Sequence, residues 1–201
     1  MSILIGLTGS IGSGKSLAAS YFKEFGAYII DADSISREVV EPNKVAWKEI
    51  SLEFGAEFLN ADQRLNREKI ANEIFQNPKK RIILENIIHP RVFAIEQKLY
   101  KSHQLSDPKA IVIIDAALLI ESNNYKNIDR VIVINSSTSI QIQRVISSSG
   151  KSEESVKSRL KTQMPLEEKL KYADYIINNE GTREELKSQV FSLYRLLKNL
   201  V

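Results

Sequence analysis

One glycine-rich segment, GSIGSGKS at residues 9–16, restricts the fold of this chain more than any other feature of its sequence. It fits the pattern G-x-x-x-x-G-K-[ST], which marks a phosphate-binding loop built between a strand and a helix. A short apolar run at residues 3–7 precedes it, and a helical pattern over residues 15–25 follows and stops at Gly26. We therefore predict a strand, a phosphate-binding loop and a helix at the start of an α/β domain.

The residue types in this segment suit phosphate chemistry. Its glycines let the backbone curl so that successive N–H groups face phosphate oxygens, and the next helix adds its positive N-terminal end. We expect Lys15 to reach the β- and γ-phosphates of ATP and the Ser16 hydroxyl to ligate Mg²⁺. The predicted ATP-binding residues here are Gly9, Ile11, Gly12, Ser13, Gly14, Lys15, Ser16 and Leu17. The alternative is a glycine-rich turn with an exposed lysine.

Four more apolar runs predict the rest of the sheet, at residues 28–30, 111–114, 131–134 and, more weakly, 175–177. Their apolarity is continuous instead of alternating, which is typical of parallel strands covered on both faces. We therefore predict an α/β fold with a five-stranded parallel sheet between helices.

Two helical stretches without a strand signal interrupt this pattern. The first contains about 80 residues, which is too long for a crossover loop and indicates a helical insertion. The second follows the fourth predicted strand. The expected division is a core of residues 1–34, 108–137 and 173–201, an insertion of residues 35–107, and a second helical attachment of residues 138–172.

Composition excludes several classes of protein. The 201 residues include no cysteine, which rules out disulfides, thiolate zinc sites and cysteine nucleophiles. A net charge of +3 is too small to indicate nucleic-acid binding. The longest apolar runs are too short to span a membrane, and the first residues do not resemble a signal peptide, so we expect a cytoplasmic protein.

A phosphate-binding loop does not by itself identify a reaction. The guanine-binding pattern N-K-x-D is absent, and a large ATPase motor would need a longer chain. These exclusions favour a small-molecule kinase whose lid closes over two bound ligands.

Three aspartates follow predicted strands. Asp31 and Asp33 come after the second strand and Asp115 closes the third, so their carboxylates should face the crevice beyond the carboxyl ends of the strands. Asp33 could accept the proton of an attacking hydroxyl, or it could cap the next helix. Asp115 could contact Mg²⁺ or its waters, or it could cap the following segment.

Motifs spread along the chain resemble the dephospho-CoA kinase family. They are LTGSIGSGKS at 7–16, IDAD at 30–33, VVEP at 39–42, LNR at 65–67, HP at 89–90, LLIE at 118–121, Gln163, and ADYIINNEG at 173–181. The resemblance implies a phosphate-loop kinase core, with the insertion as the CoA-binding domain and residues 138–172 as the lid. It implies ATP-dependent phosphorylation of the ribose 3′-hydroxyl of dephospho-CoA with Mg²⁺, and it implies no nucleic acid, membrane or obligate protein partner.

The resemblance also implies residue roles. Asp33 would be the catalytic base. The loop motif and the strand position given above already predict Lys15 as the catalytic cation and Ser16 and Asp115 as the metal residues. The residues implied near the substrate are Asp33, Arg67, His89 and Arg91, and those implied at the nucleotide outside the loop are Arg144 and Asn178.

Some of these roles have plain alternatives. His89 could be a packed residue, and Arg144 a solvated helix arginine. Ser148 stands where many family members carry a second lid arginine, a role that Arg159 or Lys151 could take. Rival functions are those of another small phosphotransferase, such as a nucleoside monophosphate kinase, or of a non-catalytic nucleotide-binding module.

Overall fold

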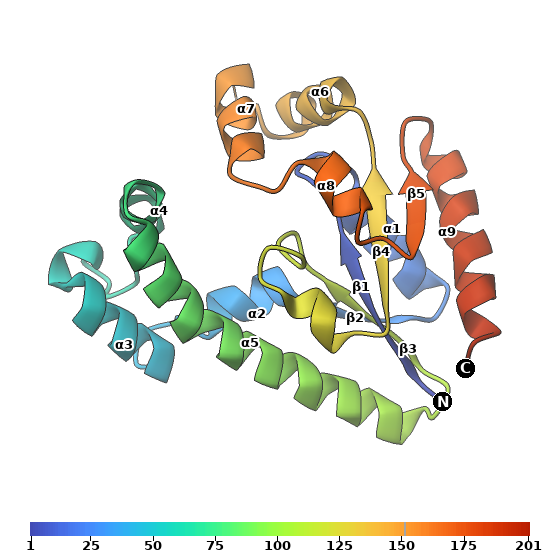
Figure 1. The fold of residues 1–201 in the computed structure, drawn as a ribbon, viewed down its shortest axis with the longest axis horizontal. Coiled ribbons are helices and arrows are strands. Elements are labelled where there is room, and N and C mark those ends of the chain that lie inside the picture. Colours follow the sequence, from blue (N-terminus) through green and yellow to red (C-terminus); the bar gives the residue numbers. More distant parts are fainter. Residues whose placement is uncertain (151) are drawn as a thin grey trace. The chain divides into compact units, whose positions relative to one another are not determined.

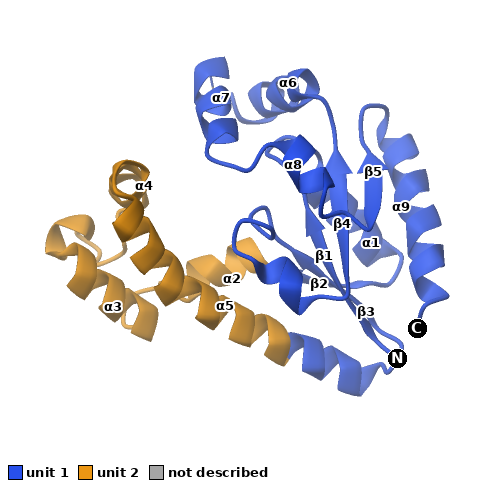
Figure 2. Cartoon of the chain, viewed as in Figure 1, with its two compact units in different colours: residues 1–31, 99–201 blue, residues 32–98 orange. Residues whose placement is uncertain are grey.

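The computed structural model describes residues 1–150 and 152–201, so Lys151 lies outside the described residues. The chain divides into two compact units (Figure 2). Unit 1 contains residues 1–31 and 99–201, and unit 2 contains residues 32–98. In the described part of the chain, every helix is too short or too polar to cross a membrane.

Unit 1 is built on the predicted parallel sheet (Figure 1). Its five strands run in the order β2-β3-β1-β4-β5, and every neighbouring pair is parallel. The strands are β1 (Ile3–Thr8), β2 (Tyr28–Asp31), β3 (Ile111–Asp115), β4 (Arg130–Asn135) and β5 (Tyr175–Asn178). Each predicted apolar run forms a strand, so the predicted fold class is confirmed.

One face of the sheet is covered by α1 (Lys15–Glu24) and α9 (Arg183–Lys198), as Figure 1 shows. Because side chains alternate along a strand, Ile3, Ile5 and Leu7 of β1 all point into this layer. There they pack with Phe22 of α1 and with the apolar stripe of α9.

The opposite face of β1 is covered by the segment between β3 and β4, which contains the 3₁₀ turn η2 (Asn124–Asn127). Gly6 faces this segment. A Cβ atom added at Gly6 would overlap the side chains of Leu119 and Ile128. The central strand therefore carries a glycine where this segment packs directly on its backbone.

In the stretch predicted as the second attachment, the residues on either side of Lys151 that the structure describes form three helices between β4 and β5 (Figure 1). They are α6 (Thr138–Ser149), α7 (Glu153–Lys161) and α8 (Leu166–Leu170). The α6 helix ends at Gly150, whose φ of 65° is the left-handed conformation that glycine adopts without strain.

Unit 2 is helical, as predicted for the insertion. It contains α2 (Ala32–Glu38), α3 (Val45–Phe54), the 3₁₀ turn η1 (Ala56–Phe58), α4 (Arg67–Gln76) and part of α5 (Pro78–Ser106). Phe54 and Phe58 pack edge to face in its core, with their ring centroids 5.6 Å apart.

The α5 helix belongs to both units, because unit 2 ends at Lys98 and the remaining turns pack on the sheet. The His103 ring stacks on Tyr28 of β2 at a centroid distance of 4.2 Å. Gln104 donates a hydrogen bond to the Ser2 hydroxyl at 2.8 Å. These contacts place the division within the helix, whereas the sequence pattern put the end of the insertion at residue 107.

Candidate active site

The glycine-rich loop follows β1, the central strand of the sheet. From β1 the chain first builds β2 and β3 on one side and later β4 and β5 on the other, so the loop lies at the topological switch point. Ligands of open parallel sheets bind beyond the carboxyl ends of the strands at such a point. This location favours the phosphate site that the sequence predicts.

The loop leads directly into α1, which begins at Lys15. Its N-cap is Gly14, which has no side chain to accept hydrogen bonds from the first N–H groups of the helix. These donors and the positive end of the helix can therefore receive an anion.

Two loop positions require glycine. Gly12 and Gly14 have φ values of 77° and 92°, which other residues rarely adopt. A Cβ atom at Gly12 would overlap the backbone of Gln141 in α6, and one at Gly14 would overlap the side-chain amide of Asn179. At these two positions, neighbouring residues leave no space for a side chain.

The structure brings together two of the predicted residues. Lys15 Nζ lies 2.5 Å from Asp115 Oδ1, and both side chains are about nine-tenths buried. Asp115 ends β3 and pairs in register with Leu7 of β1 and Asp31 of β2. The cation and the carboxylate therefore meet at the edge of the sheet where the phosphate-binding loop begins.

Asp115 and Ser16 provide oxygen ligands of the kind that Mg²⁺ prefers. Ser16 is exposed at the start of α1. Within the described ranges, no three His, Asp or Glu side chains gather as a metal cluster. A donor set of this size fits Mg²⁺, which commonly takes one or two protein ligands and completes its shell with phosphates and waters.

A second set of contacts ties the segment between α7 and α8 to the loop. The Ile11 N–H donates to Gln163 Oε1 at 3.0 Å. The backbone N–H of Met164, the residue after Gln163, donates to Glu121 Oε1 at 2.9 Å. Lys169, whose side chain is fully buried, lies 2.9 Å from the same Glu121 oxygen and donates to the Ala117 carbonyl at 2.7 Å.

Arg144 also lies at the loop, whereas Asn178 does not. The Asn178 side chain accepts a hydrogen bond from Asn135 Nδ2 at the end of β4 and β5. The next residue, Asn179, donates to the Ser13 carbonyl at 2.7 Å and accepts from Arg144 Nη1 at 2.9 Å. Sequence reasoning gave Asn179 no role.

The remaining predicted residues of the nucleotide site have ordinary surroundings. Leu17 of α1 packs partly against the core. Ser148 Oγ donates to the Val145 carbonyl within α6, and Arg159 is exposed on α7. None of these contacts assigns a replacement for the second lid arginine.

Asp33 is half-buried in unit 2 and lies in the first turn of α2. Because α2 begins at Ala32, the position that precedes the helix is occupied by Asp31. The alternative that Asp33 caps this helix from outside is therefore wrong, because Asp33 lies within its first turn. The first turn still favours a negative charge, through the helix dipole.

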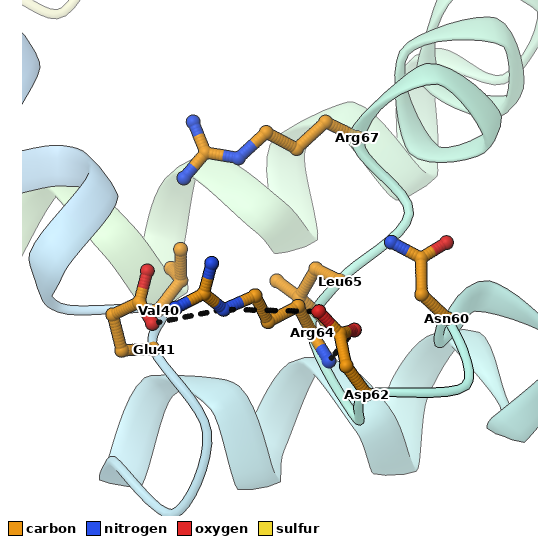
Figure 3. A pocket seen from close by; sticks show the side chains of 7 residues that line it. All are labelled: Val40, Glu41, Asn60, Asp62, Arg64, Leu65 and Arg67. Carbon is orange, nitrogen blue, oxygen red and sulfur yellow. Dashed lines mark hydrogen bonds and ion pairs between the residues drawn. The ribbon is translucent and has the colours of Figure 1, made fainter.

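Unit 2 contains a cavity of about 460 Å³ in which Arg67 lies (Figure 3). Its lining residues are Val40, Glu41, Asn60, Asp62, Arg64, Leu65 and Arg67. Arg64 Nε is 3.5 Å from a Glu41 carboxylate oxygen. Arg67, at the start of α4, makes no ion pair with any residue that the structure describes and is exposed. Figure 3 shows both arginine side chains reaching toward the Val40–Glu41 segment.

His89 and Arg91 lie on α5 in the same unit. The His89 ring is half-buried and stacks on Phe93. Burial lowers the pKa of His89 below its ordinary value of 6.5; the nearby Glu85 carboxylate opposes this shift and Arg81 adds to it. Arg91 Nη2 lies 2.6 Å from Glu49 Oε1, so its guanidinium already has a carboxylate partner.

Comparison with known proteins gives one consistent family. A family model described as dephospho-CoA kinase matches residues 3–185. A dephospho-CoA kinase of Bacillus cereus is 42% identical over 199 residues, covering 99% of this chain and 98% of that protein.

Solved structures agree with this result. A Thermus thermophilus protein superposes with a TM-score of 0.80 at 28% identity, covering 98% of each chain. A Campylobacter jejuni dephospho-CoA kinase gives a TM-score of 0.70 at 27% identity, covering 99% of this chain and 98% of that one.

Proposed function

The chain belongs to the dephospho-CoA kinase family, and from this premise we propose that it transfers the γ-phosphoryl group of ATP to the ribose 3′-hydroxyl of dephospho-CoA, giving CoA and ADP. The observation that carries the proposal is the Lys15–Asp115 pair beside a phosphate-binding loop at the switch point of a parallel sheet. A phosphate-binding loop of this kind can hold a nucleoside triphosphate. The match to the dephospho-CoA kinase family model indicates which acceptor the phosphoryl group reaches.

The proposed nucleotide site consists of the loop and its immediate neighbours. The N–H groups at the start of α1 hold phosphate oxygens, and Lys15 neutralises charge on the phosphoryl group during transfer. Arg144, 2.9 Å from the carbonyl of Asn179 next to the loop, adds a second cation for the phosphates. The proposed domain roles are core for 1–34, 108–137 and 173–201, CoA binding for 35–107, and lid for 138–172. Within 35–107, the turns of α5 after Lys98 belong to the core unit and pack on the sheet, so CoA binding falls to the residues before them.

A divalent cation, which we propose is Mg²⁺, would neutralise phosphate charge and orient the γ-phosphate. Ser16 and Asp115 would hold it together with phosphate oxygens and waters. Lys15, which lies against Asp115, would then share this carboxylate with the metal site.

Asp33 is the proposed catalytic base. A carboxylate can accept the proton of the 3′-hydroxyl as that oxygen attacks the phosphorus atom. The position of Asp33 supports this role, since it lies half-buried in the first turn of α2, two residues after the end of β2.

The proposed acceptor site includes Arg67, His89 and Arg91. Dephospho-CoA carries a diphosphate, and the exposed guanidinium of Arg67 beside the unit 2 cavity suits an anion of that kind. His89 would bind as a neutral hydrogen-bonding group, because burial lowers its pKa. Arg91, which is paired with Glu49, would exchange this carboxylate for an anionic group of the substrate or would shape the site while it stays paired.

We propose that the protein works in the cytoplasm. ATP is present there, and a chain without cysteine has no disulfide that the reducing environment could break. The partners proposed are its two substrates alone.

The test is a coupled assay of ADP formation with dephospho-CoA against a panel of nucleosides and nucleoside monophosphates. The proposal expects Mg²⁺-dependent turnover with dephospho-CoA and a product phosphorylated at the 3′-oxygen. Faster turnover with a nucleoside monophosphate would replace the acceptor. ATP binding without turnover on any acceptor would indicate a non-catalytic module.

A further inference from the structure

Asn179 is the first residue after β5, and its backbone continues the sheet. Its N–H donates to the Asn135 carbonyl at 2.8 Å, which extends the pairing of β5 with β4 by one residue. The residue is 95% buried. The sheet therefore holds this asparagine rigidly at the carboxyl end of the strands.

The side-chain amide of Asn179 fixes one peptide of the phosphate-binding loop. Its Nδ2 donates to the Ser13 carbonyl at 2.7 Å. In a trans peptide the carbonyl of one residue and the N–H of the next point in opposite directions. Holding the Ser13 carbonyl toward Asn179 therefore turns the Gly14 N–H away from Asn179.

Asn179 also holds the guanidinium of Arg144. The backbone carbonyl of Asn179 accepts from Arg144 Nη1 at 2.9 Å, and its Oδ1 lies 3.4 Å from Nη2. A planar guanidinium that contacts two oxygens of one residue has a defined orientation. The same Nη1 lies 3.9 Å from the position of a Cβ added at Gly14, so the cation is held beside the loop.

We propose that Asn179 is a positioning residue for ATP: it orients Arg144 and the Ser13–Gly14 peptide toward the phosphates without being a catalytic group itself. This inference rests on the proposed nucleotide site. It explains why a fully polar side chain is buried next to a loop built from glycines.

The test is a double-mutant cycle of Asn179→Ala and Arg144→Ala, read as the Kd of ATP by direct titration. Each single variant should weaken ATP binding by about 10-fold, the scale of a hydrogen bond to a charged group. Asn179→Ala keeps the backbone carbonyl that accepts from Arg144 Nη1 and removes the Oδ1 contact to Nη2. Because the guanidinium then contacts one oxygen instead of two, the double variant should be less impaired than the product of the two single effects. Strictly multiplicative effects, or an unchanged Kd in Asn179→Ala, would overturn the proposal.

Two further variants separate the contacts and guard against loss of folding. Asn179→Asp keeps oxygens for Arg144 but cannot donate to Ser13, so it should weaken ATP binding yet retain coupling to Arg144. Arg144→Lys keeps the charge but not the two-oxygen contact, and should resemble Arg144→Ala. Wild-type affinity in Arg144→Lys would overturn the role of orientation. Asn199→Ala, at the exposed end of α9, is the matched control and should bind ATP normally.

Kinetics distinguish positioning from general damage. In Asn179→Ala the KM for ATP should rise about 10-fold while the KM for dephospho-CoA changes less than about 2-fold. Equal rises in both would indicate a merely structural residue. Failure of the wild-type protein to use dephospho-CoA would refute the proposed function, whereas the ATP-binding cycle would still decide the role of Asn179.

Discussion

The Glu121–Lys169 ion pair offers the clearest stability prediction. Lys169 Nζ lies 2.9 Å from Glu121 Oε1, with side-chain exposures of 0% for the lysine and 12% for the glutamate. Glu121→Ala removes the negative charge that faces a buried ammonium group. Breaking a buried pair from one side costs about 3–5 kcal/mol, because the remaining charge stays in a poorly hydrated site.

For a chain of this length, 1 kcal/mol corresponds to about 2–4 °C in Tm, so we expect Glu121→Ala to lower the Tm by roughly 6–20 °C. The variant also loses the hydrogen bond from the Met164 N–H, which adjoins the Gln163 contact to the loop. Thermal unfolding monitored by circular dichroism measures the effect.

The matched control is the exposed pair of Lys171 and Glu168, which has the same residue types and a distance of 2.7 Å. Glu168→Ala should cost less than about 1 kcal/mol, because water screens that pair. Replacing both buried partners, as Glu121→Leu with Lys169→Met, should recover most of the lost stability. If Glu121→Ala unfolds within 2 °C of Glu168→Ala, the reasoning from burial is wrong.

Three further predictions concern the proposed site. Lys15→Ala should reduce kcat by about 10²–10³-fold, the scale of a single electrostatic contact to the transition state, and activity within a few-fold of wild type would remove Lys15 from the mechanism. Asp33→Asn should bind ATP and keep nearly the same Tm but lose about 10²–10⁴-fold in kcat; a fully active Asp33→Asn enzyme would point to Asp31 as the next carboxylate to test. His89 titrates below 6.5 in the folded chain, so as the pH falls below 6.5 the unfolded chain takes up its proton first and stability is lost. The Tm of His89→Gln should therefore fall less than the Tm of the wild type when the pH is lowered from 7 to 5. An equal fall in the two proteins would contradict the burial argument.

The local features of this protein follow from its sequence because they depend on neighbouring residues. Continuous β-branched runs predicted all five strands, since such runs suit strands that are buried on both faces. The order of glycines, lysine and serine at residues 9–16 predicted a loop between a strand and a helix. Gly26 ended the first helix at a φ of 106°, a conformation that glycine adopts without strain.

The contacts around the loop were decided by tertiary structure. Lys15 and Asp115 are 100 residues apart in sequence, Ile11 and Gln163 are 152 apart, and Ser13 and Asn179 are 166 apart. Periodicity carries no information about which distant residues meet, because that depends on strand order and on how the connecting helices pack. The sequence predicted that Asp115 and the phosphate-binding loop both follow the carboxyl ends of strands, but the direct contact of Asp115 with Lys15 depends on β3 lying beside β1.

The pair Asn178 and Asn179 shows the same limit at the scale of one residue. Successive side chains of a strand point to opposite sides, so only one of the two can face the loop. The prediction chose Asn178, but the register of β5 on β4 sets Asn178 opposite Asn135 and directs the amide of Asn179 to Ser13. Sequence determined that polar residues end this strand, and the hydrogen-bond register between strands determined which of them reaches the phosphate-binding loop.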